Sequence, residues 1–208
     1  MSLSPLESPL WRGLYGSPLT EQMLGDGPLI DAMIRVESAL AGACADAGLV
    51  PRDEADRLCD ALAEMTLAPE ALAEGAARDG VPIPALLAAL RARLDPELAE
   101  WLHWGATSQD ICDTATVLAL RAFGTALADE IAALLDRLGV LAADEAETVQ
   151  LARTRTQGAM PTTFGATVAT WGHALAESGA RLADAMTRLS TLSLHGAAGT
   201  DAALGERA

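Results

Sequence analysis

The stretch from Trp101 to Thr114 gathers polar side chains of the kinds that hold anions and move protons. Its polar members are His103, Thr107, Ser108, Gln109, Asp110 and Asp113. Hydroxyl and amide groups donate hydrogen bonds, and a histidine exchanges a proton near neutral pH. This combination suits the binding of an anionic small molecule and acid–base chemistry on it.

The same stretch has the pattern of a helix N-terminus. Thr107 or Ser108 can act as the N-cap, and Asp110 follows Thr107 by three residues, as in a capping box. The free N–H groups and the positive dipole end of a helix favour a carboxylate or phosphate there. The alternative is an ordinary capped helix start, with His103 packed as a satisfied side chain beside two tryptophans.

A second polar segment covers residues 152–164. Arg153 and Arg155 are two cations in an otherwise acidic chain, and they stand beside Thr154 and Gln157. An arginine can hold a carboxylate through two parallel hydrogen bonds, so the segment suits a multiply charged carboxylate. The alternative is a polar loop whose arginines pair with nearby Asp or Glu.

The elements that must position these segments are helical. Residues 1–110 are predicted to form a small N-terminal helical domain, because proline repeatedly interrupts short apolar periodicities. Its helices are expected to begin at Ser17-Pro18, near residue 29, after Pro51, at Ala68-Pro69, after Pro84 and at Asp95-Pro96. Residues 1–16 are predicted to be irregular.

Residues 111–208 have a different pattern, since no proline occurs between Pro96 and Pro161. Apolar residues recur in steps of three and four from Val117 to Leu141. Together with the proline-free residues on either side, from Asp110 on, this predicts a helix of roughly 38 residues, about 57 Å long. The same rhythm from Val168 to Leu192 predicts a second long helix. We expect an all-α fold in which these helices run antiparallel, joined by a loop over 152–164 and with no β-hairpin.

Composition limits the partners. The 208 residues carry a formal net charge of −15, which disfavours nucleic acid and acidic membrane surfaces. Cys44, Cys59 and Cys112 are odd in number and indicate reduced thiols in a cytoplasmic protein. No Cys/His spacing indicates zinc, no signal peptide is recognisable, and no apolar run is long enough for a membrane span. The glycine-rich turn at 196–199 fits no nucleotide-binding motif.

Four stretches together resemble the fumarase/aspartase superfamily. His103–Thr114 resembles its first signature region, and Ala152–Gly165 resembles its second. His195–Thr200, followed by Ala-Ala-Leu-Gly205, and Val36–Ala41 fit as well. The wording Gly-Ala-Thr-Ser-Gln-Asp is similar to the 3-carboxy-cis,cis-muconate cycloisomerase branch, whose nearest relatives in pattern are the adenylosuccinate lyases.

The resemblance implies a function and an assembly. Members of the superfamily are homotetramers built on a central bundle of long helices, and each active site combines three signatures from three subunits. The cycloisomerase branch converts 3-carboxy-cis,cis-muconate to a γ-lactone in protocatechuate catabolism, without metal or organic cofactor. The expected partners are therefore a small polycarboxylate and further copies of the chain.

The resemblance also implies roles for individual residues. Catalytic roles fall to His103, Ser108 and Arg155, and substrate contacts to Thr107, Gln109, Asp110, Arg153, Thr154 and Gln157. The second signature often reads Arg-Thr-His, but here the third position is Arg155. Because arginine does not release its proton, Arg155 is expected to hold a carboxylate rather than act as an acid, which disfavours adenylosuccinate lyase. His173 is expected to be structural or on the surface, and His195 stays unassigned.

The superfamily's third signature, a Gly-Ser-Ser-x-Met-Pro type loop, does not occur in these 208 residues. We therefore expect the chain to correspond to the N-terminal half or more of a full enzyme, with weak or no turnover by itself. Two alternatives stay open. One is another fumarate-releasing lyase of the adenylosuccinate or argininosuccinate type, and the other is a non-catalytic helical oligomerisation module.

Overall fold

The fold is that of a computed structural model, which describes residues 4–6, 8–200 and 204. The contacts divide the chain into two compact units. Unit 1 comprises residues 1–123 and 191–208, and unit 2 comprises residues 124–190. This division differs from the expected boundary at residues 110 and 111, because the first turns of the long helix and the segment after residue 190 pack within unit 1.

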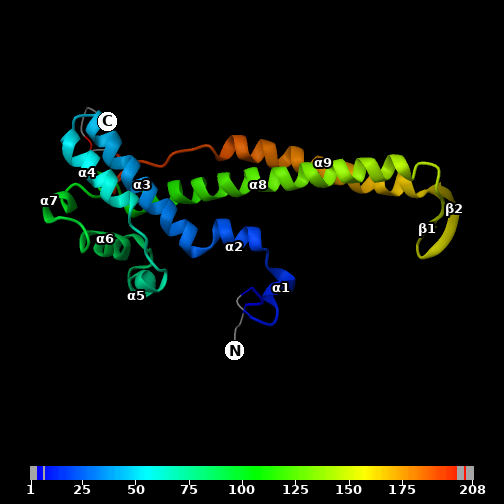
Figure 1. Ribbon diagram of the computed structural model, residues 1–208, viewed down its shortest axis with the longest axis horizontal. Coiled ribbons are helices and arrows are strands. Elements are labelled where there is room, and N and C mark those ends of the chain that lie inside the picture. Colours follow the sequence, from blue (N-terminus) through cyan, green and yellow to red (C-terminus); the bar gives the residue numbers. More distant parts are fainter. Residues whose placement is uncertain (1–3, 7, 201–203, 205–208) are drawn as a thin grey trace. The chain divides into compact units, whose positions relative to one another are not determined.

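Unit 1 consists of short helices followed by the start of a long one (Figure 1). Its helices are α1 (Arg12–Tyr15), α2 (Pro18–Leu24), α3 (Asp26–Asp46), α4 (Arg52–Ala63), α5 (Glu70–Asp79), α6 (Ile83–Arg91), α7 (Pro96–Ala99) and the first part of α8 (Ser108–Asp144). The predicted starts of α2, α4, α5 and α7 agree with these bounds to within a residue or two, whereas α3 begins at Asp26 rather than near residue 29 and α6 begins at Ile83, before Pro84. The single turn of α1 lies in a region that was predicted to be irregular.

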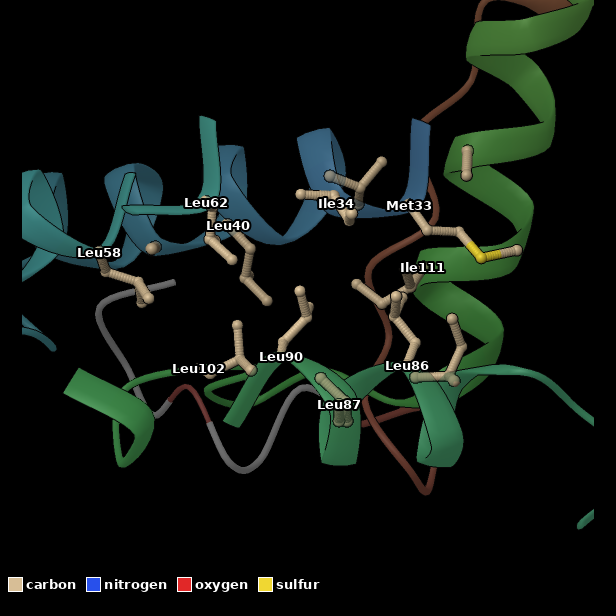
Figure 2. Packing of buried hydrophobic residues seen from close by; sticks show 14 of the residues in the cluster. Met33, Ile34, Leu40, Leu58, Leu62, Leu86, Leu87, Leu90, Leu102 and Ile111 are labelled. Atoms are coloured by element: carbon tan, nitrogen blue, oxygen red, sulfur yellow. The ribbon is translucent and has the colours of Figure 1, made fainter. Parts of the chain in front are cut away.

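The core of unit 1 is aliphatic (Figure 2). Helices α3, α4 and α6 and the beginning of α8 contribute leucines, isoleucines and one methionine, several of them with no exposed surface. The fully buried members include Leu58, Ile83, Leu86 and Leu90, and Ile111 is 1% exposed. Burying each such side chain contributes about 1.5–3 kcal/mol, so this core fixes α8 at its first turn.

Unit 2 contains the rest of α8 and α9 (Phe164–Leu189), which lie side by side and antiparallel (Figure 1). A Cβ added at Gly124 would meet Met186, one at Gly179 would meet Ile131, and one at Gly172 would meet Leu138. These contacts recur every seven residues on each helix, which is the repeat of coiled-coil packing. The antiparallel pair predicted from the apolar periodicity is confirmed.

The segment between the two helices is an antiparallel hairpin, and the expectation of a loop without β-structure was wrong. Strand β1 (Val149–Thr154) pairs with β2 (Gln157–Thr163), with a register irregularity between Leu151 and Arg153. The usual sequence signal for a two-residue hairpin is Asn-Gly or a similar pair, which is absent here. The tight turn consists of Arg155 and Thr156, both with positive φ.

Among the described residues, no helix combines the length and the apolar character needed to cross a bilayer.

Candidate functional site

The polar stretch begins α8 as a capped N-terminus. Helix α8 starts at Ser108, which makes Thr107 its N-cap. The backbone N–H of Thr107 donates to Oδ2 of Asp110 over 3.0 Å, and the N–H of Asp110 donates to the carbonyl of Thr107. This is the carboxylate half of a capping box, and it confirms the start predicted from the spacing of Thr107 and Asp110.

Asp110 also ties a distant segment to this helix start. Its Oδ1 accepts from the N–H of His195 over 2.9 Å, and its Oδ2 accepts from the N–H of Gly196 over 3.0 Å. The residue is only 2% exposed. Burial alone would raise the pKa of Asp110, but three backbone N–H donors and the nearby His195 hold the pKa below its usual value. With both oxygens occupied, the geometry favours a positioning role over direct contact with a ligand.

His103 lies just before the helix and is held by a residue of α3. Its Nδ1 is 2.7 Å from Oε1 of Glu37, and the two side chains are 13% and 0% exposed. The backbone of His103 has a φ of 66°, in the left-handed region that costs a non-glycine residue energy. The histidine is therefore neither free nor simply packed between tryptophans, because its ring is oriented by a carboxylate.

Glu37 is a site residue to which the sequence analysis gave no role. It was noticed only as part of the Val36–Ala41 match, because nothing local links it to a histidine 66 residues away. A charged residue at an apolar position of α3 was the one available signal, since buried Glu is rare without a partner. Its Oε2 is buried and has no hydrogen-bond partner among the described residues.

The remaining predicted residues of this stretch lie on the first turn of α8. Ser108 is half-buried and Gln109 is exposed. The amide of Gln109 donates to Oδ1 of Asp113 one turn later, over 2.6 Å. The hydroxyl of Ser108 and the amide of Gln109 thus stay on the accessible side, whereas Asp110 faces inward.

A cavity of about 410 Å³ in unit 1 adjoins Asp110. Its walls are mostly aliphatic side chains of α3, α8 and residues 192–194, and its polar members are Arg35, Asp110, Thr114 and Ser193. The hydroxyl of Thr114 donates to the carbonyl of Ser193 and accepts from its N–H. An apolar wall suits side-chain packing better than a polyanion, and His103, Ser108 and Gln109 do not line this cavity.

The second predicted segment forms the tip of the hairpin in unit 2. Arg155 and Thr156 have φ values of 44° and 69°, and Thr154 pairs with Gln157 across the turn. These side chains and that of Arg153 are exposed. Among the described residues, no carboxylate lies within ion-pair distance of either arginine. The alternative of a loop whose arginines are paired within the chain is therefore not what the structure shows.

Backbone strain coincides with the two predicted segments. Across residues 4–6, 8–200 and 204, the non-glycine residues with positive φ are His103, Arg155 and Thr156. Such outliers cluster at functional sites because a packed structure is needed to hold them. His173 is exposed on α9 and His195 is exposed beside Asp110, and neither has this signature.

The described part of the chain contains no group of three or more His, Cys, Asp or Glu side chains arranged to hold a metal ion. The chemistry available at these segments is that of hydrogen-bond donors, two guanidinium groups and one oriented imidazole. Such groups can bind carboxylates and stabilise negative charge that develops on them.

Comparisons with known proteins identify the family. A family model described as lyase matches residues 15–208. The 3-carboxy-cis,cis-muconate cycloisomerase of Bradyrhizobium diazoefficiens is 36% identical over 208 residues, which cover 99% of this chain and 46% of that protein. An adenylosuccinate lyase of Methanocaldococcus jannaschii is 32% identical over 93% of this chain and 42% of its own length.

A solved structure shows the same fold. The crystal structure of 3-carboxy-cis,cis-muconate lactonizing enzyme from Pseudomonas putida matches with a TM-score of 0.90 and 35% identity. The match covers 97% of this chain and 46% of that one. The chain thus spans about half the length of the relatives that it matches. Because the family model covers nearly all of its residues, the chain belongs to the fumarase/aspartase family of lyases.

Proposed function

We propose that this chain supplies two segments of a cycloisomerase active site that acts on 3-carboxy-cis,cis-muconate. The observation that carries the proposal is the coincidence of strained backbone with the donor-rich segments at His103 and Arg155. The similarity to cycloisomerases from two bacteria, at 36% and 35% identity, supports the choice of substrate.

The reaction is an isomerisation of the acid forms; the attacking carboxylate loses its charge when it becomes the lactone ester, so the ionised substrate takes up one proton from a protein group or from water. An oxygen of one substrate carboxylate attacks a carbon of a C=C bond and forms the C–O bond of the lactone ring. The electron pair of that double bond moves toward a neighbouring carboxylate, where the charge is enolate-like. A proton then adds to the carbon between them, and donors aimed at that carboxylate lower the barrier.

The residues of this chain fit the anchoring of that charge. Arg155 is a fixed cation with no partner among the described residues, and Arg153 stands beside it. Ser108 and Gln109 offer donors at the start of α8, where the helix dipole favours an anion. His103 lies four residues before the cap, and its imidazole is oriented by Glu37.

We further propose that the site is completed by other copies of the chain, as a homo-oligomer. In unit 2, large apolar side chains stay exposed on both long helices, among them Leu134 at 47%, Val140 at 64% and Trp171 at 52%. Exposed apolar residues in such number indicate a surface that another chain covers. A cytoplasmic location and a role in aromatic catabolism belong to the same proposal.

Ligand-dependent thermal unfolding tests the substrate class. We expect 3-carboxy-cis,cis-muconate to raise the Tm of the chain, with a smaller effect from adenylosuccinate and argininosuccinate. The Arg155→Ala variant should lose the shift, whereas Arg181→Ala should keep it, because Arg181 pairs with Glu177 on the outside of α9. No shift with any of these ligands, even at high concentration, would leave only a helical oligomerisation module.

A stronger effect of adenylosuccinate than of the muconate would instead favour the other lyase branch. The 32% identity to an adenylosuccinate lyase is the reason to include adenylosuccinate among the ligands. Light scattering of the eluting protein, measured in parallel, tests the assembly. A monomer at every concentration would contradict the proposed shared site.

A further inference from the structure

Within residues 4–6, 8–200 and 204, the imidazole of His103 has one close polar partner, and that partner comes from another helix. Nδ1 of His103 lies 2.7 Å from Oε1 of Glu37, which belongs to α3. The distance is that of a hydrogen bond. The orientation of the ring is thus set by α3 and not by the neighbours of His103 in sequence.

The burial of Glu37 makes this contact consequential. Its side chain has no exposed surface, and its Oε2 has no partner in the part of the chain that the structure describes. A buried carboxylate is costly unless a donor compensates for lost hydration. In the described residues, His103 is the hydrogen-bond partner that compensates for the burial of Glu37.

Helix α3 holds the turn before α8 at two points. Besides the Glu37 contact, the thiol of Cys44 lies 3.9 Å from the carbonyl oxygen of Trp104. Glu37 and Cys44 are seven residues apart, which places them on the same face of α3. These contacts adjoin His103, whose backbone has a φ of 66°.

The contact links the tautomer of His103 to Glu37. A carboxylate that carries no proton only accepts hydrogen bonds, so a contact of that kind requires the proton on Nδ1. In a neutral imidazole the other nitrogen, Nε2, is then an acceptor with a free lone pair. Nε2 is on the ring edge that points away from Glu37, and 13% of the side chain is still accessible.

We infer that Glu37 is a positioning residue, which fixes the Nδ1–H tautomer of His103 and leaves Nε2 as the nitrogen available to a ligand. The inference deepens the proposed function and rests on it for the meaning of that ligand. The tautomer itself is a property of the free chain and can be measured without any substrate.

Nuclear magnetic resonance of the chain with ¹⁵N-labelled histidine tests the inference directly. The spectrum is recorded in alkaline solution, where imidazole side chains are neutral, and the His103→Gln variant identifies the His103 signals. We expect a protonated Nδ1 and an unprotonated Nε2 for His103. A proton found on Nε2 in the unmodified chain would overturn the inference.

A variant pair assigns the effect to Glu37. In Glu37→Ala, His103 should change to the Nε2–H form that free imidazole side chains favour, whereas Glu74→Ala, at an exposed position of α5, should leave the spectrum unchanged. A folded Glu37→Ala chain that keeps the Nδ1–H form would contradict the role of Glu37. If circular dichroism shows that this variant does not fold, the spectrum of the unmodified chain still decides.

Adding propane-1,2,3-tricarboxylate separates this inference from the proposed function. A shift of the His103 Nε2 signal, lost in Arg155→Ala, supports a shared anion site. If the tautomer is as expected but no tricarboxylate moves the signal, the substrate proposal fails and the role of Glu37 stands.

Discussion

The two polar segments have similar side chains, but they differ in how many of their polar groups have a partner within their own unit. At the start of α8, the cap and the histidine are held by Asp110 and Glu37, both nearly inaccessible. At the hairpin tip, the side chains of Arg153 and Arg155 are exposed and no carboxylate pairs with them among the described residues. The first segment is held by contacts within unit 1, whereas the arginines of the second segment are exposed in unit 2.

In the proposed shared site, this difference gives the two segments different tasks. A preorganised segment orients reacting groups, because its geometry is fixed before a ligand arrives. An open cationic segment contributes binding and charge stabilisation once a partner or substrate is present. Substitutions in the first segment should therefore mainly change stability, and those in the second should mainly change binding.

The largest effect is expected from Asp110→Ala. Its removal leaves the N–H groups of Thr107, His195 and Gly196 without their acceptor, and we expect the free energy of unfolding to fall by about 3–5 kcal/mol. The control is Asp113→Ala, an exposed carboxylate on the same turn, with a change within about 0.5 kcal/mol. Urea unfolding measures the effect of each variant. Equal effects would contradict the distinction between the buried carboxylate of Asp110 and the exposed one of Asp113.

The depressed pKa of Asp110 adds a dependence on acid. The pKa of an Asp in the unfolded chain is about 3.9, and the pKa of folded Asp110 is lower. In the window between these two pKa values the unfolded chain binds a proton that the folded chain does not, so the free energy of unfolding falls as the pH is lowered. The stabilising contribution is fully present above that window and is lost as the pH falls through the folded pKa. The difference in the free energy of unfolding between the unmodified chain and Asp110→Asn should therefore become smaller as the pH is lowered, which urea unfolding at a series of pH values measures. A difference that stays constant would exclude this carboxylate as the source.

A smaller effect is expected where the hairpin joins α9. A Cβ at Gly165 would lie 2.4 Å from the carbonyl oxygen of Ala142 and 2.9 Å from backbone atoms of Ala146. These backbone atoms cannot move aside as a flexible side chain would, so Gly165→Ala should lower the free energy of unfolding by about 1–3 kcal/mol. Gly139→Ala meets nothing within 4 Å and should instead stabilise α8 by about 0.5–1 kcal/mol. Thermal unfolding distinguishes the two signs.

The smallest change in stability should come from Arg155→Gly, and it sharpens the comparison most. Glycine adopts the φ of 44° without strain, so we expect an unchanged or slightly higher stability, by up to about 1 kcal/mol. Calorimetric binding of a tricarboxylate should nevertheless weaken strongly, because the cation is gone. Retained affinity would show that the hairpin tip is not part of the anion site.

Much of the helical framework follows from local sequence signals. Proline at the start of α2 and the cap at Thr107 act within one helical turn, so these helices could be predicted from neighbouring residues alone. The seven-residue rhythm of α8 and α9 likewise predicted their pairing. The hairpin was missed because its turn has no glycine, and the register of β1 and β2 depends on pairing that no local pattern encodes.

By itself, the sequence determined the mostly helical character, the positions of the two polar segments and the residue types available there. Only the tertiary structure decided that Glu37 orients His103 and that Asp110 faces inward to hold residues 195 and 196. The partners in these contacts are 66 to 86 residues apart in the chain. Periodicity and capping act over a turn or two of helix, whereas a buried carboxylate finds its donor only after the core around it has formed.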